Sequence, residues 1–141
     1  PRQGPAEKDH IVVIEDDDSI RRAIQVILES SGFEVTVCAS AEEAEVLLDQ
    51  LSVDLILLDL GLPGKNGNQF LRDLRAKPTH KETPVIVLTA AGAEERQAAL
   101  LGGALEVVGK PFSEESLASL IRGTLNQAHL HDQSAQPNQG E

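Results

Sequence analysis

The chain has 141 residues, of which 40% are hydrophobic and only three are aromatic, and its formal net charge at pH 7 is −11. A chain of this length fits one domain, and its core must be aliphatic. The negative charge argues against direct binding of nucleic acid, because duplex binding depends on Lys and Arg side chains that neutralise phosphates. No apolar run approaches the roughly 20 residues that a membrane helix needs, so we expect no membrane span.

Aliphatic runs predict five strands. Residues 11–14, 55–58 and 85–88 are continuous aliphatic runs, which are typical of strands buried on both faces of a parallel sheet. Residues 34–37 alternate between polar and apolar side chains, which predicts an edge strand with one wet face. Residues 107–108 are a shorter fifth candidate.

Apolar residues at helical spacing predict five helices between and after these runs. The helices centre on residues 20–28, 44–51, 70–74, 93–101 and 117–125. Ser40 and Glu43 form a capping box before the second helix, and Asp18 and Ser113 stand where the caps of the first and last helices are expected. Five alternations of strand and helix predict a three-layer α/β fold with a parallel sheet and right-handed crossovers.

The ends of the chain indicate where the folded domain begins and ends, and its single cysteine indicates the compartment. Residues 1–9 are polar and indicate a linker, whereas residues 127–141 lack periodicity and predict a disordered tail, so the folded domain is expected over residues 10–126. Because the chain starts at Pro1 and contains no Met, we expect a processed product or a segment of a longer protein. Cys38 has no partner for a disulfide, and its apolar surroundings predict a packed thiol in a reducing, cytoplasmic compartment.

Polar side chains follow four of the five predicted strands. Residues 15–18 are acidic and follow the first strand, Asp59 follows the third, Thr89 the fourth, and Lys110 follows the fifth after one glycine. In open α/β sheets, ligands bind outside the carboxyl ends of the strands. Each residue alone has an ordinary interpretation, as a solvated turn, a helix cap or a surface lysine. Their coincidence at one sheet edge predicts a functional site.

The chemistry of these groups favours metal-assisted phosphoryl transfer. Crowded carboxylates raise each other's pKa unless a cation neutralises them. Oxygen ligands indicate a hard ion, and Mg²⁺ is the usual ion beside phosphate. Asp59 is then a plausible nucleophile toward phosphorus, and Mg²⁺, the Lys110 ammonium and the Thr89 hydroxyl could each take one phosphoryl oxygen.

Four segments together resemble the receiver domain of two-component response regulators. They are IVVIEDD at 11–17, DLILLDLGLPG at 54–64, PVIVLTA at 84–90 and GKPF at 109–112, and the resemblance covers about residues 10–126. The resemblance implies a flavodoxin-like (βα)5 fold with the sheet order 2-1-3-4-5. It also implies phosphorelay signalling, with a histidine kinase or a phosphotransfer domain as the phosphodonor. Such a domain is no enzyme beyond catalysing its own phosphorylation and dephosphorylation.

The resemblance also assigns roles to single residues. Asp59 is implied as the phosphoacceptor and as a Mg²⁺ ligand. Asp16 is implied to ligate Mg²⁺ directly, Glu15 mainly through water, and Gly61 through its backbone carbonyl.

Two further roles concern the phosphoryl group. Thr89 matches the switch hydroxyl and Lys110 the phosphate-binding lysine, whose bond to Pro111 is expected to be cis. The family often has Tyr or Phe three residues before this lysine, where the sequence has Val107. A β-branched aliphatic side chain cannot swing as an aromatic ring does. The switch is therefore expected to act through the loop after Thr89 and the fourth helix.

Three alternatives remain open at this point. A phosphatase of the haloacid-dehalogenase type would need a second Asp two residues after Asp59, where the sequence has Gly61. A flavodoxin-like cofactor module would meet repulsion between the acidic residues 15–18 and a flavin phosphate. A receiver-shaped binding module that is never phosphorylated would not need Asp59, Thr89 and Lys110. The domain itself could be the receiver of a hybrid histidine kinase, the receiver of a longer regulator, or a stand-alone regulator.

Overall fold

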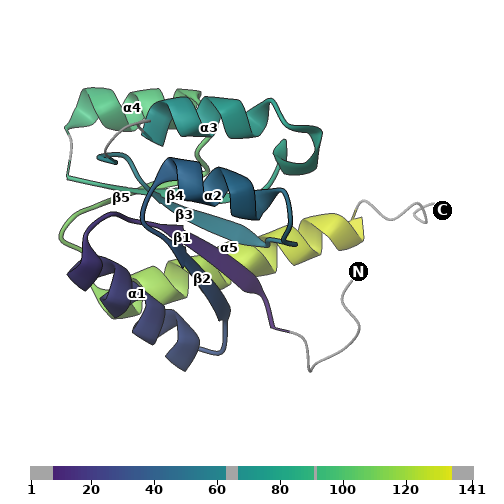
Figure 1. Ribbon diagram of the computed structural model, residues 1–141. Helices are drawn as coiled ribbons and strands as arrows, with labels where there is room; N and C mark the ends of the chain where they lie inside the picture. The colour runs from purple at the N-terminus through teal and green to yellow at the C-terminus, as the bar shows by residue number, and fades with distance from the viewer. Residues whose placement is uncertain (1–7, 63–66, 91, 135–141) are drawn as a thin grey trace.

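The computed structural model describes residues 8–62, 67–90 and 92–134 and shows a five-stranded parallel sheet with helices on both faces (Figure 1). The sheet order is β2-β1-β3-β4-β5, which confirms the predicted flavodoxin-like α/β fold. In chain order, the elements are β1 (His10–Ile14), α1 (Asp18–Ser30), β2 (Glu34–Cys38), α2 (Ala41–Leu48), β3 (Leu55–Asp59), α3 (Gly67–Arg75), η1 (Pro78–His80), β4 (Val85–Thr89), α4 (Ala93–Leu101), β5 (Glu106–Gly109) and α5 (Glu114–Ser134).

The three inner strands carry the core. Every residue of β1, β3 and β4 is buried, as expected for continuous aliphatic runs covered on both faces. Strands β2 and β5 lie at the edges and are partly exposed, which fits the alternation of β2. Because successive side chains point to opposite faces, each inner strand contributes to two cores.

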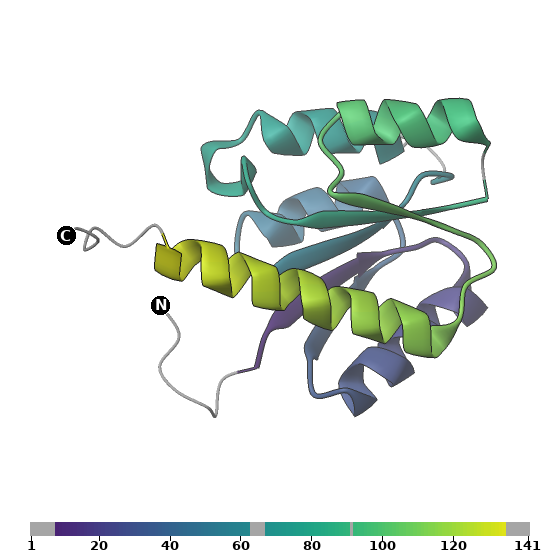
Figure 2. The ribbon, with the colours of Figure 1, turned by 180° about the vertical axis from the view of Figure 1, so that it is seen from behind.

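Two helical layers cover the two faces of the sheet. Helices α1 and α5 lie on one face, and α2, α3 and α4 lie on the other (Figures 1 and 2). On the α5 side, Leu117, Ile121 and Leu125 pack with the apolar face of α1. On the other side, Phe70, Leu71 and Leu74 of α3 are buried. Of the nine residues of α4, only Ala99 is buried, so α4 is the least anchored of these helices.

Helix caps follow the predicted chemistry with one shift. The N-cap of α1 is Asp17, and not Asp18 as expected, because Asp17 has the extended backbone of a cap and accepts a hydrogen bond from the Ile20 amide at 2.9 Å. Asp18 is the first helical residue and pairs with Arg21. Both remaining caps are at the predicted residues: Ser40 accepts a bond from the Glu43 amide, and Ser113 accepts one from the Ser116 amide. The second bond of the predicted capping box is shifted by one residue, because the Glu43 carboxylate accepts from the amide of Ala39 and not from that of Ser40.

The last helix is longer than the sequence indicated. We expected a disordered tail from residue 127, but α5 continues to Ser134. Residues 124–134 contain no Gly or Pro, and Ala, Leu and Gln favour helix, so helix propagation beyond the packed face is physically reasonable. Residues 135–141 and residues 1–7 of the predicted linker lie outside the described residues. No described helix is both long and apolar enough to cross a membrane.

Candidate functional site at the carboxyl edge of the sheet

Four strand ends bring the predicted site residues together. Glu15 directly follows β1, and Asp59 and Thr89 are the last residues of β3 and β4. Lys110 follows β5, and its backbone amide donates to the Thr89 carbonyl at 2.8 Å. Strand register sets this arrangement, because Asp59 is paired with a residue of β4 and Thr89 with Gly109 of β5.

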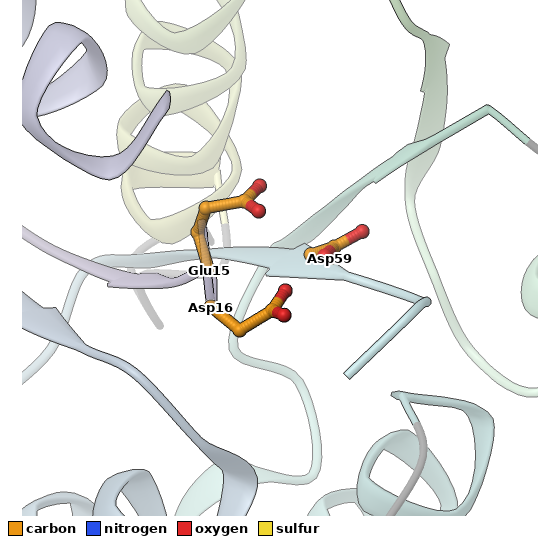
Figure 3. Close-up of side chains that lie close together, drawn as sticks. All are labelled: Glu15, Asp16 and Asp59. Carbon is orange, nitrogen blue, oxygen red and sulfur yellow. The ribbon is translucent and has the colours of Figure 1, made fainter. Parts of the chain in front are cut away.

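Three carboxylates converge on one space. Glu15, Asp16 and Asp59 each offer one oxygen, and these oxygens lie within 4.8 Å of one another. Figure 3 shows the three carboxylates pointing to the same side, next to the end of β3 that carries Asp59. Glu15 and Asp59 are buried, with 1% and 5% of their surfaces exposed, whereas Asp16 is exposed to solvent. An oxygen-only cluster with one open side fits a hard, partly hydrated divalent cation.

Lys110 links the two buried carboxylates. Its Nζ lies 3.1 Å from Oε1 of Glu15 and 3.2 Å from Oδ1 of Asp59, so one ammonium faces two acidic side chains. The peptide bond between Lys110 and Pro111 is cis, as predicted. Glu15 and Asp59 are two carboxylates that share the single ammonium of Lys110. This cluster therefore has an excess of one negative charge when both carboxylates are ionised, and Asp16 adds to that excess.

Burial and this excess of negative charge both raise the pKa of Glu15. Burial raises the pKa of Glu15, and the charge of Asp59 raises it further, whereas the hydrogen bond and charge of Lys110 lower it only in part. Burial alone would lower the pKa of Lys110, but its interactions with Glu15 and Asp59 outweigh burial, so this pKa is raised. Glu15 is therefore a carboxylate that a bound cation would stabilise.

A pocket of about 430 Å³ opens beside Asp59. Its lining contains residues that the sequence analysis did not single out, Asn68 on α3 and Glu95 on α4. Polar residues on helices carry no distinctive sequence signal, because most of them are solvated surface, and only the fold places these two at the site. The Gly61 amide donates to Oδ1 of Asp59 at 3.2 Å, and the predicted ligand role of the Gly61 carbonyl stays a prediction.

The remaining lining residues are three that the strand ends predicted, Gly61, which the resemblance assigned, and two neighbours. They are Asp59, Leu60, Gly61, Thr89, Ala90 and Lys110.

Cys38 lies apart from this chemistry. It is buried at the end of β2 without a disulfide partner, and burial raises the pKa of its thiol to about 11. A thiol in this state is protonated at neutral pH and is a weak nucleophile. The prediction of a packed cysteine is confirmed.

Known proteins with similar sequences are response regulators. The profile of the response regulator receiver domain matches residues 11–122. The transcriptional regulatory protein CpxR of Klebsiella pneumoniae is 41% identical over 124 residues, which are 87% of this chain and 52% of that protein. The chain spans about half the length of the curated relatives it matches.

Solved structures show the same architecture. The chemotaxis response regulator CheY4 of Vibrio cholerae is similar with a TM-score of 0.78 and 27% identity, covering 82% of this chain and 98% of that one. The signal receiver domain of a histidine kinase from Syntrophus aciditrophicus has a TM-score of 0.79 and 28% identity, covering 84% and 91%. With its fold, its strand-end residues and this match over most of its length, the chain belongs to the response regulator receiver domain family.

Proposed function

We propose that the domain accepts a phosphoryl group on Asp59 in a Mg²⁺-dependent reaction and relays it as a conformational signal. The phosphodonor is a phosphohistidine of a histidine kinase or of a phosphotransfer domain. The observation that carries the proposal is the cluster of Glu15, Asp16 and Asp59 with Lys110 between the two buried carboxylates. A structural ion pair would need one carboxylate, and not three.

The transfer needs a nucleophile, an electrostatic clamp and a leaving group. A carboxylate oxygen of Asp59 forms the new bond to phosphorus, while the bond between phosphorus and the donor imidazole nitrogen breaks and its electron pair returns to the imidazole. Asp16, Asp59 and the Gly61 carbonyl would hold Mg²⁺ directly and Glu15 mainly through water. The bound ion supplies positive charge that neutralises the carboxylates and the transferred oxygens.

Lys110 and Thr89 hold the product. The Lys110 ammonium, already 3.2 Å from Asp59, is placed to donate a charge-assisted hydrogen bond to one phosphoryl oxygen. Thr89 is buried at the end of β4 and lines the same pocket, so its hydroxyl can take another oxygen. Movement of Thr89 would then draw the following loop and α4. Helix α4 suits this role for two reasons. It has a single buried residue, and its N-cap is a glycine, Gly92, which has no side chain to cap the helix.

The signal is passed on by a larger protein. Relatives of about twice this length include a transcriptional regulatory protein, and one structural neighbour is the receiver of a histidine kinase. We propose that an attached effector or kinase domain, and not this acidic domain itself, contacts DNA or further partners in the cytoplasm.

Mass spectrometry after treatment with acetyl phosphate and Mg²⁺ tests the proposal. One phosphoryl group is expected on the wild type, none on Asp59→Asn, and none when the metal is chelated. Asp49→Asn is the matched control, because Asp49 is exposed and pairs with Lys77 far from the site.

Three results would contradict the proposal. A label that survives in Asp59→Asn would place the acceptor elsewhere, and an unlabelled wild type would favour a binding module. Sustained turnover of a phosphate monoester would indicate a phosphatase.

A further inference from the structure

The guanidinium of Arg96, in the first turn of α4, lies against the backbone of β5. A Cβ atom built on Gly109 would lie 2.2 Å from Nη2 of Arg96 and 3.4 Å from its Cζ. Only glycine leaves this space open without a shift of the arginine. The contact therefore depends on two residues together, an arginine on α4 and a glycine on β5.

The next side chain on the same face of β5 is that of Val107. Val107 and Gly109 are two residues apart, so they share one face of the strand. Val107 packs into the core on the side of α2, α3 and α4, which places Gly109 on that side as well. Arg96 thus lies between α4 and the sheet, over the point of β5 where Gly109 has no side chain.

The charge of Arg96 has no partner among the described residues. Its side chain is half-buried, yet no hydrogen bond or ion pair reaches its guanidinium from the part of the chain that the structure describes. Partial removal from water weakens the solvation of a cation, and a nearby anion compensates for that loss. An unpaired guanidinium beside a functional site is therefore open to an added anion.

The position of this cation is set by the site. Gly109 is paired with Thr89, and the next residue is Lys110. On α4, the residue before Arg96 is Glu95, which lines the pocket beside Asp59. Arg96 therefore lies against the strand end that pairs with Thr89 and leads into Lys110, the two residues that would hold a phosphoryl group.

We infer that Arg96 is a positioning residue by which α4 responds to phosphorylation, with its guanidinium held over Gly109 as a second cation for the phosphoryl charge. This inference rests on the proposed phosphorylation of Asp59. A phosphoryl group adds about −1.5 to −2 charges at pH 7. Attraction to Arg96 draws the first turn of α4 toward the end of β5. Val107, a rigid aliphatic side chain, does not take part in this response.

The experiment is a titration of the Mg²⁺-loaded protein with beryllofluoride, a phosphoryl mimic, followed by amide and arginine side-chain NMR. Arg96→Gln is expected to weaken beryllofluoride binding about two- to five-fold, the range of one partly exposed charge interaction. Arg96→Lys should restore most of the affinity, because it keeps the charge. Arg72→Gln is the matched control, since it removes an equal charge from an exposed position on α3.

Gly109→Ala tests the contact itself. It leaves Arg96 in the chain but displaces the guanidinium, so part of the affinity should be lost. In Arg96→Gln the same alanine should have little further effect. The Arg96 side-chain signal of the wild type should shift on adding beryllofluoride and shift less in Gly109→Ala.

The outcomes separate this inference from the proposed function. If the wild type binds beryllofluoride but Arg96→Gln binds it as tightly as Arg72→Gln does, the role of Arg96 is wrong and phosphorylation stands. Equal losses in Arg96→Lys and Arg96→Gln would likewise overturn the role of the charge. If the wild type does not bind beryllofluoride, both proposals fail.

Discussion

Replacing Glu15 by Gln should stabilise the protein in the absence of metal. Glu15 is 1% exposed and faces one ammonium and one buried carboxylate. At an effective dielectric constant of about 20, attraction to Lys110 over 3.1 Å is about 5 kcal/mol, and repulsion from Asp59 over at most 4.8 Å is at least about 3.5 kcal/mol. The difference of about 2 kcal/mol is smaller than the several kcal/mol that burial of an ion costs.

The expected gain in the free energy of unfolding is about 1–3 kcal/mol at neutral pH. Urea denaturation with a chelator present measures it, in the wild type and in Glu15→Gln. The gain should depend on pH. Because folding raises the pKa of Glu15 from its ordinary 4.5, the native state keeps a proton that the unfolded chain has lost, so the stability of the metal-free wild type falls as the pH rises from 4.5 through the raised pKa. Glu15→Gln lacks this loss.

Two results would refute this reasoning. The first is a destabilised Glu15→Gln at neutral pH, which would mean that Lys110 more than compensates for the burial of Glu15. The second is a stability gap that does not widen as the pH rises above 4.5. Added Mg²⁺ should reduce the stability difference between Glu15→Gln and the wild type. The wild type keeps the Glu15 carboxylate, so it is expected to bind the ion more tightly and to be stabilised more by it.

Three further predictions concern the scaffold. Gly67→Ala should lower the free energy of unfolding in urea by about 1–3 kcal/mol, because a Cβ at Gly67 would lie 2.7 Å from Cα of Leu60 and backbone cannot yield cheaply. Arg75→Ala should lower it by about 1–3 kcal/mol, since Nε and Nη2 of Arg75 donate to the Gly103 carbonyl at 3.3 and 2.8 Å; unchanged stability would show that water replaces the bonds. Cys38, whose thiol pKa is raised to about 11, should react with a chromogenic thiol reagent at pH 8 only as fast as the protein unfolds, and a rapid reaction of the native protein would contradict this.

The fold could be predicted because local and global signals agree. The inner strands are uninterrupted aliphatic runs, and such runs suit only strands covered on both faces. The caps at Ser40 and Ser113 could be predicted because their side-chain bonds are made within the same segment. The end of α5 could not be predicted, since residues 127–134 are weakly periodic. They extend a helix whose core contacts are made by earlier residues, up to Leu125.

The site was only partly visible in the sequence. Glu15, Asp59 and Thr89 were found because strand ends of a parallel sheet meet at one edge. Asn68, Glu95 and Arg96 lie on helix surfaces, where polar residues are ordinary, and tertiary packing alone brings them beside the strands. The importance of Gly109 was hidden for a related reason, because a glycine before Lys110 has no chemistry of its own.

The buried charges oppose the folding of the metal-free domain, and we propose that this opposition makes the edge of the sheet responsive. An aliphatic core would be more stable if apolar residues of similar volume replaced Glu15, Asp59 and Lys110. Under the proposed function, neutralisation by a cation would remove the repulsion, and a phosphoryl group would then add negative charge at the same place. Each step changes the balance of charge around Lys110 while β1 and β3 stay fixed by their packing. We therefore expect the less anchored side of the site, where α4 meets β5, to take up the change.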